Sequence, residues 1–408
     1  MTTITAKPAP RQALLPTALV VAGLLLIAAN LRAGITTIGP VLTELQRDLG
    51  LSSLAASILI SLPLLAFAVI SPVTPALARR LGLEQSLALG LAALVVGLVT
   101  RSLPAQATLW VGTALVGVAI AVLNVALPAL VKRDFPTRIG QITGAYSAVQ
   151  SIFAAIAAGV AIPVAHATDL GWRLPLAMWA GVALLAFGVM APQLRRHTVV
   201  PARQDDLRID SHSFENRPWR SPWRTALGWQ VTAFMGIQSI GYYIFITWLP
   251  SIERAAGTSE TAAGMHQFLL NGCAIIGSIS CSALLPRLRD QRALAAGVPV
   301  LTVTAGVGLL LAPAWGALWA AMIGVAGGVT IVLSLSFFGL RTRHHSQASD
   351  LSGMAQCVGY LFAAAGPVAI GALHDATGSW TPALVVSIAL QVVLIGFGYL
   401  AGRDRFVD

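Results

Sequence analysis

A lone arginine in an apolar stretch is the first residue of this sequence whose type and position suggest chemistry. Arg32 follows an apolar run that extends from Leu14 through Ala29, and Asn30 lies two residues before it. A charge near the centre of a bilayer costs at least ~2.5–3.5 kcal/mol, so an arginine at that depth needs compensation. Compensation can come from the membrane surface, from an acidic side chain or from an anionic ligand.

Neither the surface nor an acidic residue is within easy reach of Arg32. About eight residues, or ~12 Å of helix, separate it from Pro40, where we expect the first helix to end. The 16 acidic residues all fall outside the middle of the apolar segments. We therefore expect Arg32 to anchor an anionic or strongly electronegative solute, because a guanidinium stays charged and offers a planar fork of donors. One arginine without a second favours a monoanion or a neutral polar molecule over a dianion.

Three pairs of tyrosine and glutamine recur at a spacing of four residues. They are Tyr146 with Gln150, Gln238 with Tyr242, and Gln356 with Tyr360. Residues i and i+4 share one face of a helix, so each pair presents a ring and an amide together. We expect these faces to contribute to the substrate site. The alternative is hydrogen bonding between helices, which is worth about 0.6 kcal/mol per pair in membranes.

Further polar residues also interrupt apolar segments. Asn30 and Asn124 are expected to face inward, because an amide that faces lipid stays unsatisfied. Gln267 and Asn271 share a helix face, and we include all four in the predicted substrate site. The neighbouring His266 could titrate near neutral pH and couple solute movement to protons; the alternative is a neutral, hydrogen-bonded histidine near a helix end.

The elements that must position these residues are membrane-spanning helices. The chain has 408 residues, of which 56% are hydrophobic and 10% charged, whereas soluble domains carry roughly 25% charged residues. We predict an all-α integral membrane protein with 12 transmembrane helices in two pseudo-symmetric six-helix bundles, 1–192 and 226–408, joined by a hydrophilic linker, 193–225. The apolar segments are 13–40, 52–78, 85–103, 107–131, 140–164, 172–192, 226–250, 263–285, 293–311, 314–340, 349–372 and 380–402.

Loop charges predict the orientation in the membrane. The N-terminus and every second loop after it carry 21 of the 26 basic residues. By the positive-inside rule, both termini and the linker are expected in the cytoplasm, as in a multi-pass protein of the inner membrane. The net charge of +10 is thereby attributed to cytoplasmic loops, and no nucleic-acid partner is predicted.

Landmarks in the two halves repeat at an offset of 210 residues. The matched positions are Pro40 and Pro250, Arg79 and Arg289, and Arg133 and Arg343. Such matches indicate two parallel repeats related by an axis along the membrane normal. At the same offset Arg32 corresponds to Tyr242, so the second half brings no matching charge.

The organisation resembles the major facilitator superfamily, with 6+6 helices, a basic middle loop and charged loops after helices 2 and 8. The superfamily loop signature Gly-x-x-x-Asp-Arg-x-Gly-Arg-Arg corresponds here to residues 75–84, in which Arg80 and Gly82 fit and Arg79 replaces the acid. The stretches NLR, SLPLLAFAVISP, RSLP and LP·LVKRDFP…TGAYS are similar to the cyanate/nitroimidazole permease family. This resemblance implies a central cavity lined by helices 1, 4, 7 and 10 with 5, 8 and 11, and transport of small anions or nitro-heteroaromatic compounds.

We predict a monomeric secondary active or facilitative transporter that works by alternating access in the lipid bilayer, with no cofactor, metal site or enzymatic motif. Its expected cytoplasmic gate consists of Arg79, Arg80, Lys132, Arg133, Asp134, Arg341, Arg343 and Asp350. One alternative is a multidrug-type exporter of neutral or cationic compounds, against which an unpaired arginine counts. A membrane sensor or membrane enzyme is a further alternative, disfavoured by the lack of a signalling domain.

Overall fold

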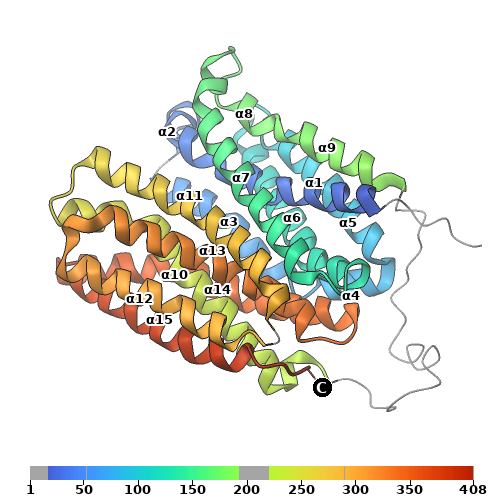
Figure 1. Cartoon of the computed structure of the whole chain (residues 1–408). Coiled ribbons are helices and arrows are strands. Elements are labelled where there is room, and N and C mark those ends of the chain that lie inside the picture. Colours follow the sequence, from blue (N-terminus) through green and yellow to red (C-terminus); the bar gives the residue numbers. More distant parts are fainter. Residues whose placement is uncertain (1–16, 52, 193–219, 289, 408) are drawn as a thin grey trace, which may run out of the picture.

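A computed structural model describes residues 17–51, 53–192, 220–288 and 290–407 (Figure 1). The predicted basic N-terminus and most of the predicted linker, 193–219, lie outside the described residues. In the described part of the chain the regular structure is helical, which confirms the predicted all-α class.

The helices form two groups, one on each side of the linker. The first group contains α1 (Thr17–Thr36), α2 (Ile38–Leu49), α3 (Ser53–Ile70), α4 (Thr74–Leu81), α5 (Leu83–Thr100), α6 (Gln106–Asp134), α7 (Ile139–His166), α8 (Arg173–Ala177) and α9 (Trp179–Met190). The second contains α10 (Ala226–Ala255), α11 (Glu260–Leu284), α12 (Arg292–Leu311), α13 (Gly316–Leu340), α14 (His345–Thr377) and α15 (Thr381–Ala401). Short 3₁₀ turns are η2 (Pro222–Arg224), η3 (Leu285–Arg287) and η4 (Pro313–Trp315). Figure 1 shows the first group in blue to green and the second in yellow to red.

Within the described residues, each predicted span corresponds to one helix or one interrupted pair: α1–α2, α3–α4 and α8–α9 are the pairs. Ten of these runs are long and apolar enough to cross a bilayer, and the α3–α4 pair, bent by 58°, makes eleven. The 30-residue α10 is long enough to span but is interrupted by polar residues such as Gln238.

Two proline positions show that the predicted helix ends were wrong. Pro250 lies inside α10, which continues to Ala255, and Pro40 lies in the first turn of α2. A proline in the first turn of a helix loses nothing, because the N–H groups there have no intrahelical acceptor. At Pro250 the helix continues because another side chain binds the backbone carbonyl that this proline leaves free, as described below.

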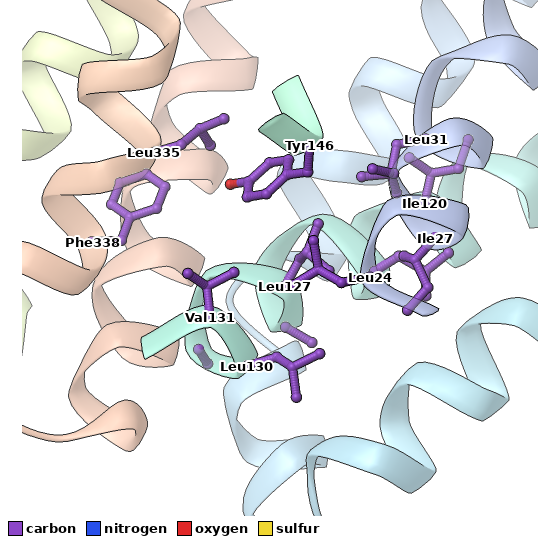
Figure 2. Packing of buried hydrophobic residues seen from close by; sticks show 14 of the residues in the cluster. Leu24, Ile27, Leu31, Ile120, Leu127, Leu130, Val131, Tyr146, Leu335 and Phe338 are labelled. Atoms are coloured by element: carbon purple, nitrogen blue, oxygen red, sulfur yellow. The ribbon is translucent and has the colours of Figure 1, made fainter. Parts of the chain in front are cut away.

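The apolar cores show where the two groups meet. One large cluster joins them, combining residues such as Leu127 and Val131 of α6 with Phe337 and Phe338 of α13. Figure 2 shows Tyr146 of α7 pointing from the first group toward Leu335 and Phe338. The remaining clusters each belong to a single group: one surrounds Val41, Leu109 and Trp172, and two others lie among α10–α15.

Close backbone contacts between the groups lie at one end of the bundle. We call it the basic end, because it carries the basic loops after α4, α6 and α13. There, a Cβ atom on Gly144 of α7 would lie 2.1 Å from the Cβ of Ser282 of α11, and one on Gly353 of α14 would lie 2.7 Å from the carbonyl oxygen of Ser71. Ser282 also donates to the carbonyl of Gln141, at 3.0 Å. The groups are therefore closed against each other at the basic end and have separate cores at the opposite end.

Gly144→Val is expected to open the basic end, because a larger side chain cannot fit against Ser282. Spin labels at Val73 and Leu284 would report the basic end, and labels at Leu170 and Asp375 the opposite end. We expect the label distance at the basic end to lengthen and the distance at the opposite end to shorten.

Gly159→Val is the matched control on the same helix, because nothing lies within 4 Å of a Cβ at Gly159. Unchanged distances in Gly144→Val, or equal changes in both variants, would show that this glycine contact does not hold the basic end closed.

Candidate functional site

Arg32 lies at the level where the two groups part. Its neighbour Leu31 belongs to the core that joins the groups, whereas Ile38, less than two turns later, belongs to the separate core of the first group. The Arg32 side chain is half-buried. It therefore stands at the boundary between the closed basic end and the opposite end.

The described contacts of Arg32 lead to its own counterpart in the repeat. Its Nη1 donates to the hydroxyl of Tyr242 at 3.4 Å, and the guanidinium carbon lies 5.6 Å from the Tyr242 ring centroid. Tyr242 is 210 residues later in the chain, the same offset that relates the two halves. Two positions related by a twofold axis can touch only close to that axis. The Arg32–Tyr242 contact therefore lies near the pseudo-symmetry axis, where a site shared by both groups is expected.

Tyrosines lie near this guanidinium. Besides Tyr242, which contacts it, Tyr243 and Tyr360 lie within electrostatic range of Arg32, and Tyr146 lies within electrostatic range of Tyr360. These are four of the five tyrosines in the chain. The ring of Tyr243 packs edge-on against that of Tyr242, with centroids 5.6 Å apart.

Phe67 of α3 adds a further aromatic ring to this region, with its ring centroid 4.9 Å from that of Tyr360 of α14. None of the ion pairs found among the described residues includes Arg32. The guanidinium therefore faces the hydroxyl and the ring of Tyr242, with Phe67 of the first group and Tyr360 of the second packed together nearby, a setting that favours an electronegative planar molecule.

Two of the predicted substrate-binding glutamines bind carbonyls that prolines leave free. Pro250 has no N–H for the carbonyl of Ile246, and Gln267 Nε2 donates to that oxygen at 3.1 Å. In the same way Pro128 has no N–H to donate to the carbonyl of Asn124, and Gln356 Nε2 of the other group donates to that oxygen at 3.1 Å. The Gln356 bond corresponds to the alternative of hydrogen bonding between helices that was given for the tyrosine and glutamine pairs. Both bonds have the same cause, because a freed carbonyl in lipid requires another donor.

The other predicted amides bind mostly within their own helices. Asn30 donates to the carbonyl of Leu26 at 2.8 Å, and Asn271 to that of Gln267 at 2.9 Å. Gln238 donates to the hydroxyl of Ser239 at 2.8 Å, and Gln150 is buried. A role for these residues in substrate binding stays a prediction.

His266 has an acidic partner that the sequence analysis did not foresee. Its Nδ1 lies 3.0 Å from both carboxylate oxygens of Glu253, a residue with 1% of its surface exposed. Glu253 lies in the last turn of α10, which continues past Pro250. A Cβ on Gly316 would lie 2.6 Å from Glu253 Oε1, so the start of α13 covers the pair.

Arg79 and Asp350 of the predicted gate form an ion pair between the two groups, with Arg79 Nη1 2.5 Å from Asp350 Oδ1. Arg133 instead pairs within the first group, with Glu84 at 2.5 Å and Asp134 at 2.7 Å.

Arg341 and Arg343 contact the C-terminal residues of the second group. Arg341 donates to the carbonyls of Ala401 and Gly402, at 2.9 Å each, and Arg343 lies over the ring of Phe406. Arg80 is exposed and Lys132 is half-buried. Gating by this set as a whole stays a prediction.

A sequence model of the Major Facilitator Superfamily matches residues 24–367. The chain belongs to this superfamily. It is therefore a multi-pass membrane transporter of small molecules and not an enzyme, and the predicted fold is confirmed.

Two relatives confirm the narrower resemblance. The 2-nitroimidazole transporter of Escherichia coli (strain K12) is 40% identical over 386 residues, covering 94% of this chain and 95% of its own. The cyanate transport protein CynX of the same organism is 25% identical over 383 residues, covering 92% and 96%.

Among solved structures, the superfamily transporter FucP in the outward conformation aligns with a TM-score of 0.72 over 94% of this chain and 98% of its own. At 14% identity this similarity shows the fold alone.

The sequence analysis missed three residues of this region. Tyr243 could have been found as the neighbour of Tyr242, and Phe67 as the aromatic residue in the SLPLLAFAVISP stretch. Glu253 falls outside the predicted segment 226–250, because a proline such as Pro250 usually ends a helix, whereas α10 continues to Ala255.

Arg32→Met is expected to leave the free energy of unfolding of the ligand-free transporter unchanged or to raise it by about 1–2 kcal/mol. Removing a poorly compensated charge from a low-dielectric site eliminates a desolvation cost without breaking an ion pair. Thermal melting of the purified variants in detergent measures the difference.

Arg133→Met is the matched control, because it leaves the buried Glu84 without its arginine. We expect this variant to lose about 3 kcal/mol. A comparable loss in Arg32→Met would mean that Arg32 is held by a stabilising partner in the ligand-free protein.

Proposed function

We propose that this transporter carries a small anionic or nitro-heteroaromatic solute across the inner membrane by alternating access, with Arg32 as the anchor. The observation that carries the proposal is the Arg32 guanidinium, which faces Tyr242 and has no ion pair among the described residues. An anionic or nitro group would supply the negative charge that the surrounding side chains lack.

The aromatic side chains around Arg32 suit a planar solute. A ring can pack on Phe67 and Tyr360 or on Tyr242 while its oxygen atoms accept hydrogen bonds from the guanidinium. The 2-nitroimidazole transporter, 40% identical to this chain, is named for such a molecule. A single guanidinium matches one negative charge better than two.

The division of the site between the two groups supports alternating access. Arg32 belongs to the first group, whereas Tyr242 and Tyr360 belong to the second, so rocking one group against the other changes access to the solute. We propose that the basic end is cytoplasmic, following the distribution of loop arginines and lysines. The described conformation is then closed to the cytoplasm, with the Arg79–Asp350 pair as a contact that must break for inward opening.

Binding of 2-nitroimidazole and of benzoate to the purified protein tests the anchor. We expect Arg32→Gln to weaken binding of benzoate, the charged probe, by at least about 100-fold, and Arg32→Lys by about 10-fold, because a lysine keeps the charge but loses the planar fork. Isothermal titration with folded, monodisperse variants provides the measurement.

Ethidium serves as the control solute, because a cationic drug would be repelled by Arg32. If ethidium binds and Arg32→Gln tightens it, while 2-nitroimidazole and benzoate do not bind, the multidrug alternative replaces the proposal.

We further propose that the His266–Glu253 pair couples transport to protons. A buried carboxylate in contact with a histidine can exchange a proton when access to it changes. The start of α13 covers this pair, so a movement of α13 would change its access to water. In the described part of the chain, no other charged side chain contacts the pair.

Glu253→Gln is expected to abolish solute accumulation driven by a proton gradient in liposomes while exchange of labelled for unlabelled solute persists. The matched control is Glu44→Gln, because His166 and Glu44 form a more exposed pair at 2.7 Å. Accumulation that survives in Glu253→Gln, or is lost equally in Glu44→Gln, would rule out this coupling role.

A further inference from the structure

Like Arg32, a second arginine of the first group has no ion pair among the described residues. Unlike Arg32, it is fully buried. Arg101 follows the last residue of α5, and 0% of its surface is exposed. Its backbone packs against α6 at Gly112, where a Cβ atom would lie 2.3 Å from the Arg101 nitrogen. Burying a guanidinium is costly, so its hydrogen bonds must offset a large desolvation penalty.

The guanidinium of Arg101 binds two backbone carbonyls on two other spans. Nη1 donates to the carbonyl of Gly34 in α1 at 2.6 Å, and Nη2 donates to that of Leu176 in α8 at 3.2 Å. Each carbonyl lies in the last turn of its helix: α1 ends just before the interruption at Thr37, and α8 ends just before the interruption at Met178. The last carbonyls of a helix lack intrahelical donors and carry partial negative charge, which a cation stabilises.

The Gly34 carbonyl belongs to the turn that follows Arg32. The hydroxyl of Thr36 lies 3.1 Å from the carbonyl oxygen of Arg32 and 3.2 Å from that of Ala154 in α7. The hydroxyl of Thr37 donates to the carbonyl of Ala33 at 2.7 Å. Arg101 thus completes a set of side-chain bonds that ties the end of α1 to α5, α7 and α8.

We propose that Arg101 is a positioning residue for Arg32: its guanidinium fork holds the interrupted ends of α1 and α8 together and thereby fixes the anchor. Arg101 is fully buried and its Nη atoms donate to carbonyls, so it acts through α1 and not by touching the solute. This inference rests on the proposed role of Arg32. A lysine cannot replace the fork, because one ammonium group cannot reproduce its two fixed, coplanar donor directions.

Arg101→Lys and Arg101→Gln are the test variants, with 2-nitroimidazole as the probe. We expect both to bind it about 10-fold more weakly in the folded protein, and to have little further effect when Arg32 is already replaced by lysine. Unchanged binding in both variants, wild-type binding in Arg101→Lys alone, or a full additional loss in the Arg32→Lys background would each overturn the proposal.

A chemical measurement tests the same idea without the solute. In a chain whose Cys273, Cys281 and Cys357 are replaced by serine, Arg32→Cys can be modified by an anionic methanethiosulfonate reagent. We expect Arg101→Lys to change the modification rate several-fold, because residue 32 moves relative to the rest of the site. An equal rate with and without Arg101→Lys would overturn the positioning role even if 2-nitroimidazole is not a ligand.

Arg173→Gln is the matched control. Arg173 begins α8 and pairs with the Asp48 side chain of α2 at 3.0 Å, whereas Arg101 donates to a carbonyl of α1. We expect this variant to leave both the binding of 2-nitroimidazole and the modification rate of Arg32→Cys unchanged. Effects as large as those of Arg101→Lys would indicate a general disturbance of the first group and would count against the proposal.

Discussion

The structure depends on one poorly compensated charge, the guanidinium of Arg32, placed where two helix groups part. The described contacts bring it the hydroxyl and the ring of Tyr242, which compensate a cation much less than a carboxylate does. Such an arrangement is costly for the empty protein and favourable once an electronegative solute enters. The same contact joins the two groups, because Tyr242 is the repeat counterpart of Arg32. Solute binding and the relative position of the groups are therefore coupled at one place.

A second constraint, the satisfaction of backbone carbonyls away from water, explains many of the polar side chains. Pro128 and Pro250 each free a carbonyl inside a long helix, and Gln356 and Gln267 donate to those oxygens. Arg101 does the same at two interrupted helix ends. In a bilayer such donors are required, so a polar residue within an apolar segment is not by itself evidence of a solute site. The bond from Gln356 also crosses between the two groups.

The sequence predicted the helical class, the two repeats and the isolation of Arg32, because these follow from hydropathy, loop charge and the absence of acids near the residue. It could not distinguish amides that bind solute from amides that donate to free backbone carbonyls, since the i, i+4 spacing of Gln356 and Tyr360 is compatible with either role. It also placed Glu253 outside the helix, because the rule that proline ends a helix ignores a donor from another helix such as Gln267. Arg101 sits near a predicted helix end, and only its tertiary contacts reveal that it is buried.

The most direct test of this account is an experimentally determined structure of the transporter with a bound solute, 2-nitroimidazole or benzoate. The account predicts that the nitro or carboxylate oxygens lie within hydrogen-bond distance of the Arg32 guanidinium, with the ring packed against Phe67 and Tyr360 or Tyr242. A solute bound away from Arg32, or an Arg32 side chain paired with an acidic residue in that complex, would contradict it.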